Sequence, residues 1–174
     1  QKAGDDERGT AYLLAAAEGD QPSVSALNQL RVIARELGDW EQLISLSRTL
    51  AQVSEDPADR IALLIEAAEL REDPLLDREG AAELFASVVE QDPDNAKAQR
   101  FFVNYWFDKQ RWGDAVAAFE RYAPVIEALD VEGNDEARFE ATEFYSRYGV
   151  VLEKTREGAD VREHFARALE LTPT

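Results

Sequence analysis

One side-chain spacing recurs four times along this chain and constrains its fold more than any other feature. Each set has positions separated by four and then three residues, so its members lie on one face of a helix. Successive sets start 38, 34 and 46 residues apart, a period that indicates an array of helical repeats. Pro93 and Pro173 follow two of the sets by five residues and are expected to close those helices. The sets are Leu43, Ser47, Leu50; Ala81, Phe85, Val88; Ala115, Phe119, Tyr122; and Val161, Phe165, Ala168.

Composition also favours an all-α fold. Hydrophobic residues make up 45% and charged residues 32% of the 174 positions, as in folded proteins. The chain has only nine Gly and six Pro and lacks the long alternating apolar runs typical of strands. It has no cysteine, which excludes disulfides and thiolate metal sites. No apolar stretch approaches the roughly 18 residues that a membrane-spanning helix needs, so direct membrane insertion is not expected.

The net charge is −17, from 36 acidic and 19 basic residues. Such a field disfavours nucleic acid and anionic membranes, because binding either depends on Lys and Arg neutralising phosphates. It favours a protein or peptide partner with a basic segment. The alternative interpretation is that the charge serves solubility alone.

The helical segments pair into a single repeat domain over residues 1–174. A leading half-repeat is expected at 9–19, followed by repeats at about 23–54, 57–93, 96–131 and 135–174. Gly38 is expected to end one helix in the left-handed conformation, and Pro57 is expected in the first turn of another. The second helix of the third repeat is expected to continue to Val131, and Pro124 inside it is expected to kink the helix or to cost it a backbone hydrogen bond.

The apolar stripes of these helices are predicted to face the core. The stripe of the first full repeat includes Leu37, and the stripes of the last repeat include Phe139 and Leu169. A turn is expected at Arg156-Glu157-Gly158.

The last repeat resembles the tetratricopeptide repeat (TPR) most closely. That family has Trp, Leu-Gly, Tyr, Ala, Phe or Tyr, Ala and Pro at matching spacings, and this repeat aligns without an insertion. The matching residues here are Tyr145, Tyr148, Gly149, Leu152, Val161, Phe165, Ala168 and Pro173. The resemblance covers about residues 10–174 and indicates a bacterial-type TPR protein, with the chain a fragment of a longer one.

The resemblance implies a right-handed superhelical α-solenoid of antiparallel helix pairs. Small residues at fixed positions let the paired helices approach closely, while large ones fill the space between repeats. Arg31 and Val103 depart from the pattern by replacing a small residue, and Ser47 departs by replacing an aromatic one. A half-a-tetratricopeptide repeat or a generic α-solenoid stays open as an alternative.

Catalytic patterns are not found in the sequence, and we expect a protein that is not an enzyme. No Ser-His-Asp or Cys-His set can be assembled, and no Gly-rich phosphate loop exists. The single His164 is expected on the outer side of the last helix. The acidic clusters lack the oxygen spacing of a calcium loop, so neither a metal nor a cofactor is expected.

The candidate binding residues come from the resemblance, which implies that the first helix of each repeat lines a concave groove. Lys97, Arg100 and Asn104 share one helix face and could grip a carboxylate. Some members of the family clamp a peptide's terminal carboxylate with Lys, Asn and Arg in comparable places. Ordinary surface residues paired with Asp94 or Asp108 are the competing interpretation. The candidates are Asn28, Arg35, Glu69, Lys97, Arg100, Asn104, Phe107 and Ser146.

The sequence therefore predicts a non-enzymatic protein–protein interaction module, a scaffold or adaptor that holds a peptide or partner helix in its groove. The acidic residues Glu69, Glu72, Asp73, Glu143 and Glu153 would favour a basic segment. The alternative is a structural segment of a longer TPR solenoid that spaces other domains. The sequence does not determine the oligomeric state, and it favours the cytoplasm while leaving the periplasm open.

Overall fold

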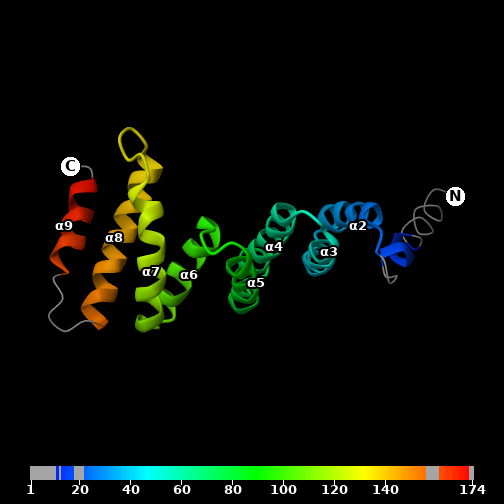
Figure 1. Ribbon diagram of the computed structural model, residues 1–174, viewed down its shortest axis with the longest axis horizontal. Helices are drawn as coiled ribbons and strands as arrows, with labels where there is room; N and C mark the ends of the chain where they lie inside the picture. Colours follow the sequence, from blue (N-terminus) through cyan, green and yellow to red (C-terminus); the bar gives the residue numbers. More distant parts are fainter. Residues whose placement is uncertain (1–10, 12, 18–21, 156–160, 173–174) are drawn as a thin grey trace. The chain divides into compact units, whose positions relative to one another are not determined.

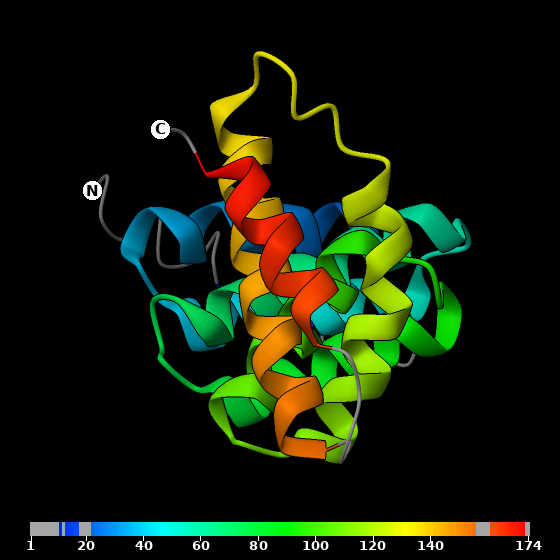
Figure 2. The same cartoon turned by 90° about the vertical axis from the view of Figure 1, so that its left-hand side faces the viewer.

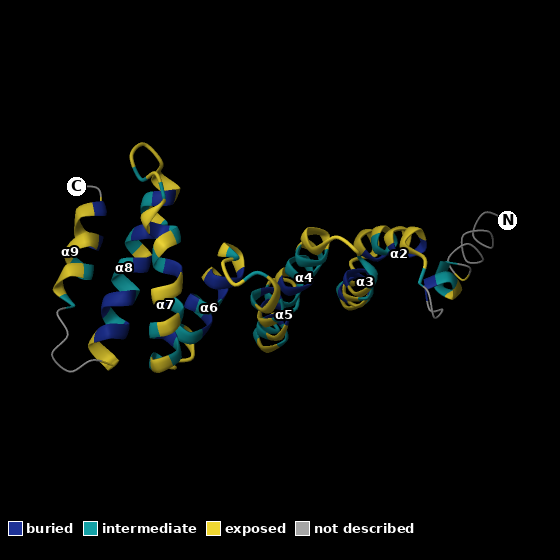
Figure 3. Cartoon of the chain, viewed as in Figure 1, coloured by how far each residue is buried: buried dark blue, intermediate teal, exposed yellow. Residues whose placement is uncertain are grey.

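The computed structural model describes residues 11, 13–17, 22–155 and 161–172, and within these residues the regular structure is all α-helical (Figure 1). The chain divides into two compact units, residues 1–93 and 94–174. Each labelled helix has a buried face and an exposed face (Figure 3). No helix in the described part of the chain combines the length and apolarity needed to cross a membrane.

Unit 1 contains two antiparallel helix pairs, whose bounds follow from their caps. These are α2 (Val24–Leu37) with α3 (Trp40–Val53), and α4 (Pro57–Glu72) with α5 (Arg78–Gln91). Ser23, Asp39, Asp56 and Asp77 cap their N-termini by accepting a backbone N–H, which satisfies a donor that the first turn leaves unpaired. Gly38 ends α2 in the left-handed conformation with φ 69°, and Pro57 opens α4, as predicted. The core around α2 and α3 is apolar: Leu27, Leu30, Ala34, Leu43, Leu46 and Leu50.

Unit 2 contains α6 (Ala96–Asp108) with α7 (Trp112–Glu127), and α8 (Asp135–Thr155) with α9 (Arg162–Leu171). Its core is aromatic, because Phe119 packs against Phe144 and stacks on Tyr148, each at 5.2 Å between ring centroids. Figure 2 shows α9 alongside α8. Gly149 allows this approach, since a Cβ added there would lie 2.8 Å from the Phe165 ring.

The prediction that the third repeat's second helix continues to Val131 is wrong. Helix α7 ends at Glu127, although Pro124 does lie inside it as predicted. The physical reason lies in the loop that follows: the Asp130 carboxylate accepts the Glu132 N–H at 3.1 Å, and Gly133 has φ 80°. These residues form a turn that competes with the helix.

Three residues predicted in apolar stripes are exposed. Leu37, the last residue of α2, is 75% exposed because the chain turns away at Gly38. Phe139 is 68% exposed, since Ala137 and Ala141 of the same helix face the core and position 139 lies opposite them. Leu169 is 74% exposed, because α9 buries Ala168 and Leu171 instead.

The remaining expectations fall partly outside the described residues. The half-repeat at 9–19 is described only at residue 11 and at 13–17, which are helical. The turn at 156–158 and the proline at 173 also lie outside the described residues. The repeat boundaries stay a prediction, as do a single domain and a superhelical course.

Candidate functional site

Unit 1 has a hollow of about 790 Å³, which is lined by residues of α2 and α4, by the C-terminal end of α3 and by the loop between α3 and α4. Helices α2 and α4 are the first helices of their pairs, and the second helix α3 lines the hollow as well. Apolar side chains lining the hollow are Val24, Leu50, Val53, Ala62 and Leu63. Carboxylates line it as well: Glu55, Asp56, Asp59 and Glu66, against the single guanidinium of Arg31.

The carboxylates near the start of α4 carry uncompensated charge. Glu55, Asp56 and Asp59 are exposed, and no ion pair to any of them occurs within the described residues. Asp56 caps α4 through the Ala58 N–H at 2.9 Å, which leaves its negative charge in place. This part of the hollow therefore attracts cations.

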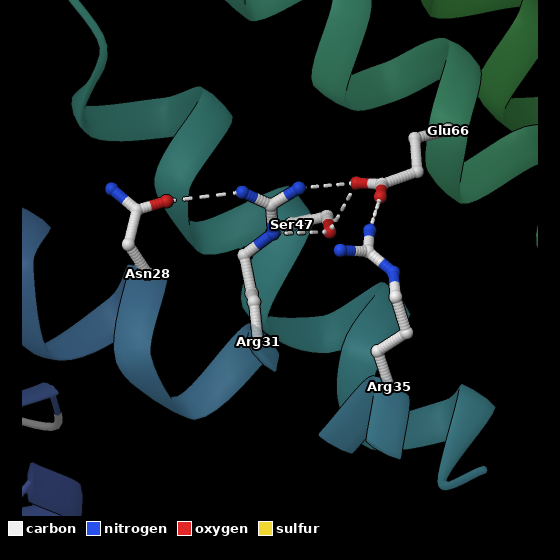
Figure 4. A network of polar contacts seen from close by, with 5 residues as sticks. All are labelled: Asn28, Arg31, Arg35, Ser47 and Glu66. Atoms are coloured by element: carbon white, nitrogen blue, oxygen red, sulfur yellow. Dashed lines mark hydrogen bonds and ion pairs between the residues drawn. The ribbon is translucent and has the colours of Figure 1, made fainter. Parts of the chain in front are cut away.

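Three residues that line the hollow, Asn28, Arg31 and Glu66, belong to a polar network (Figure 4). Ser47 is fully buried, accepts a hydrogen bond from Arg31 Nε at 3.0 Å and donates one to Glu66 Oε2 at 3.1 Å. Glu66 also pairs with the guanidinium groups of Arg31 and Arg35, and Arg31 donates to Asn28 Oδ1 at 3.1 Å. The network joins α2, α3 and α4, so it fixes the walls of the hollow relative to each other.

Of the three candidate residues of unit 1, two belong to the hollow or to the polar network. Asn28 lines the hollow and belongs to the network. Arg35 belongs to the network through Glu66, and its side chain is 52% exposed. Glu69 is exposed on α4, one turn after Glu66, and does not line the hollow.

Arg100 of unit 2 faces a carboxylate from α8. Its Nε lies 3.3 Å from Glu140 Oε1, so its partner is neither of the aspartates considered from the sequence. Tyr122 of α7 donates to the same oxygen at 2.7 Å. The pKa of Tyr122 is raised well above its ordinary value. Burial of the phenol is the larger cause, and its hydrogen bond to the Glu140 carboxylate is the second.

Asn104 and Phe107 meet the Arg147 side chain, which also comes from α8. Arg147 donates to Asn104 Oδ1 at 2.7 Å, and its guanidinium carbon lies 5.4 Å from the centre of the Phe107 ring. It also pairs with Glu143 at 2.8 Å. Lys97 is exposed at the start of α6, and Ser146 is half-buried on α8. The structure therefore brings Asn104 and Phe107 together through Arg147, and Arg100 forms a separate contact.

Sequence reasoning missed the residues at the centre of the polar contacts in unit 1 and in unit 2. Arg31 and Ser47 depart from the repeat pattern in the sequence, and in the structure they bind each other and Glu66. Their joint departure was the available signal, because a cation and a hydroxyl at positions meant for apolar contact need polar partners. Glu140 and Arg147 had no comparable signal in the sequence.

The prediction that His164 lies on the outer side of the last helix is wrong. Its ring lies 4.5 Å from the Tyr148 ring and 6.3 Å from the Tyr145 ring, between centroids, so it packs against α8. The reason is the helical period, since position 164 shares a face with the buried Ala168 one turn later. In the part of the chain that the structure describes, no three His, Cys, Asp or Glu side chains are grouped to hold a metal ion.

The antiparallel helix pairs place this chain in the TPR-like helical-repeat fold class. No family model matches the sequence, and no curated protein matches it. Among solved structures, it is similar to the crystal structure of MamA, a TPR-like protein, with 14% sequence identity and a TM-score of 0.57 over 98% of this chain and 90% of that chain. A MamA RS-1 double mutant is similar at 14% identity and a TM-score of 0.54, covering 98% and 86% of the two chains. At this identity, the likeness shows the fold alone.

Proposed function

We propose that this chain is a non-enzymatic protein-interaction module that holds a segment of a partner protein in the hollow of unit 1. The observation that carries the proposal is the hollow itself, whose lining combines apolar side chains with exposed carboxylates. Its volume lies within the range of roughly 300–1,000 Å³ that is common for ligand sites. The TPR-like fold supports a scaffold role of this kind.

The chemistry of the lining selects a basic segment. A Lys or Arg side chain can lay its aliphatic stem on Val24 and Leu63 while its charged end reaches Glu55 or Asp59. The net charge of −17 would speed the approach of such a segment. Because Glu66 is already neutralised by two arginines, the cation is expected at the Glu55–Asp59 end.

Fluorescence anisotropy with labelled synthetic peptides, Lys- and Leu-rich, tests this proposal on the full chain. The Glu55→Lys/Asp59→Lys variant should weaken binding at least about tenfold, since two attractions become repulsions. Glu127→Lys/Glu132→Lys is the matched control, because it changes the net charge equally at exposed positions of unit 2. Equal weakening in both variants would show that only net charge matters, and the groove assignment would then be wrong. Absence of peptide binding to the wild-type chain would refute the function itself.

We also retain Lys97 and Arg100 as proposed anchors for a single carboxylate of the partner. Glu140 already occupies one side of Arg100, so an incoming carboxylate has to compete with it. Glu140→Gln should therefore strengthen binding of a partner's acidic end, measured by calorimetry. Lys97→Glu/Arg100→Glu should abolish that contact, and unchanged binding would exclude the anchor.

A further inference from the structure

A second hollow in unit 1 has the opposite charge to the first. It measures about 510 Å³ and lies over α3, α4 and α5. Arg48 and Arg60 line it together with polar Gln52, Ser87 and Gln91, and no carboxylate is among its lining residues. Ala51, Leu64 and Leu84 supply its apolar part. This composition is unusual for a chain with 36 acidic and 19 basic residues.

The polar surface around Arg48 continues along α3. A neighbouring hollow of about 320 Å³ shares Arg48 and Gln52 with the second hollow and extends to Arg71. Glu41 is its single lining carboxylate. Arg71 pairs with Glu41 and also with Asp77, each at 3.0 Å, so its charge is neutralised. The two hollows thus form one surface, which we name the arginine face and define by Arg48, Gln52, Arg60 and Arg71.

Two cations of the arginine face are not neutralised by carboxylates. Arg48 is exposed, and within the described residues it makes no ion pair. Arg60 is half-buried and donates Nη2 to the Ser54 carbonyl at 3.1 Å, a contact that positions the guanidinium without cancelling its charge. Guanidinium groups recognise carboxylates by paired N–H donors, so this arrangement suits an anionic ligand.

We propose that the arginine face is a second docking site, which takes an acidic segment of a partner protein. A polypeptide fits better than a free anion, because the surface joins two hollows and offers apolar contacts from Leu64 and Leu84 that a small ion would not use. A second copy of this chain fits poorly, since two molecules of charge −17 repel each other. The charge complementarity therefore selects an Asp- or Glu-rich segment with interspersed apolar side chains.

The arginine face and the first hollow use different faces of α4. The first hollow is lined by Asp59, Leu63 and Glu66, whereas the arginine face uses Arg60 and Leu64. Neighbouring positions on a helix are rotated by about 100°, so the two sets point in different directions. Both sites can be occupied at once, and unit 1 would then bridge a basic segment and an acidic one. The arginine face does not depend on the proposed function of the first hollow.

Binding of labelled Glu- and Leu-rich peptides to the full chain at low salt tests the proposal, with amide chemical shifts locating the site. Wild-type protein should bind with shifts at Arg48, Gln52 and Arg60, and added salt should weaken binding. Arg48→Glu should weaken it at least about fivefold, since an attraction becomes a repulsion. Arg48 makes no ion pair in the described residues, so this change removes none of the fold's salt bridges. Arg121→Glu, at an exposed position of α7, makes the same charge change and should have little effect.

Three results would overturn the proposal. The first is no binding of the acidic peptide to the wild-type chain, and the second is equal weakening by Arg48→Glu and Arg121→Glu. The third is inorganic phosphate shifting the same amides and displacing the peptide at equal concentration, which would identify a simple ion site. Glu55→Lys/Asp59→Lys should leave the acidic peptide bound, which separates this test from that of the first hollow.

Discussion

Replacing Glu66 by Ala should destabilise unit 1 by far more than replacing an ordinary surface glutamate. Glu66 is 26% exposed and accepts from Arg31, whose side chain is only 15% exposed, and from Ser47, which is fully buried. Glu66→Ala therefore leaves a hydroxyl and a largely buried guanidinium without their acceptor. Hydrogen bonds to charged groups contribute about 1.5–3 kcal/mol each, so we expect a loss of about 2–4 kcal/mol in the free energy of unfolding.

The losses in unfolding free energy on replacing the partners of Glu66 should increase with the burial of each partner. Arg31→Ala should cost about as much as Glu66→Ala, because it removes the same buried contacts. Arg35→Ala should cost only about 0–1 kcal/mol, since the Arg35 side chain is 52% exposed and solvent screens its pair. The double variant Arg31→Ala/Glu66→Ala should lose about 1–3 kcal/mol less than the sum of the single losses.

Urea unfolding followed by circular dichroism, with hydrogen exchange of backbone amides, measures these losses. The midpoint should fall while the slope with urea stays constant, and exchange should accelerate in α2, α3 and α4. Glu153→Ala, at an exposed position of α8, is the control and should change the stability by no more than about 0.5 kcal/mol. A loss below that figure for Glu66→Ala, or equal losses for Arg31→Ala and Arg35→Ala, would refute the reasoning.

Three further predictions concern unit 2. Gly149→Val should lower the free energy of unfolding by about 1–3 kcal/mol, and the thermal midpoint with it, because a Cβ there meets the Phe165 ring at 2.8 Å; an unchanged midpoint would contradict the close approach. Gln110→Gly should raise the free energy of unfolding by about 0.5–1 kcal/mol, and the urea midpoint with it, since Gln110 holds φ 55° and glycine adopts this conformation without strain; a lower midpoint would count against it. Tyr122 holds its proton more tightly in the folded chain than in the unfolded one, so its contribution is complete below about pH 10 and is lost as the pH rises further. Tyr122→Phe should flatten this alkaline decline in the urea midpoint, and identical declines in both proteins would exclude the assignment.

The helices themselves could be predicted from the sequence because their determinants are local. Gly38, Pro57 and the capping aspartates act within a few residues of where they stand. The predicted end of the third pair at Val131 is wrong, because the turn at Asp130 and Gly133 depends on backbone geometry that the residue types do not determine.

The candidate sites were less accessible to sequence reasoning because their contacts are long-range. Arg31 meets Ser47 across 16 positions and Glu66 across 35. Arg147 meets Asn104 across 43 positions. A helical period predicts which residues lie outside the core. Which of their charges pair with each other depends on how neighbouring helix pairs pack.

The buried contacts of Ser47 also affect which helix pairs pack against each other in this array. Stacked repeats that join through apolar side chains alone offer similar surfaces, so one pair can in principle pack against the wrong neighbour. A hydroxyl shut away from water tolerates only a neighbour that brings an acceptor to the right place. Of the helix pairs in unit 1, the one beginning at Pro57 brings that acceptor, Glu66. This contact therefore selects which helix pair packs against α2 and α3. If helix pairs are exchanged between copies of the chain, we expect the correct neighbours to pair at this junction before they pair elsewhere in unit 1.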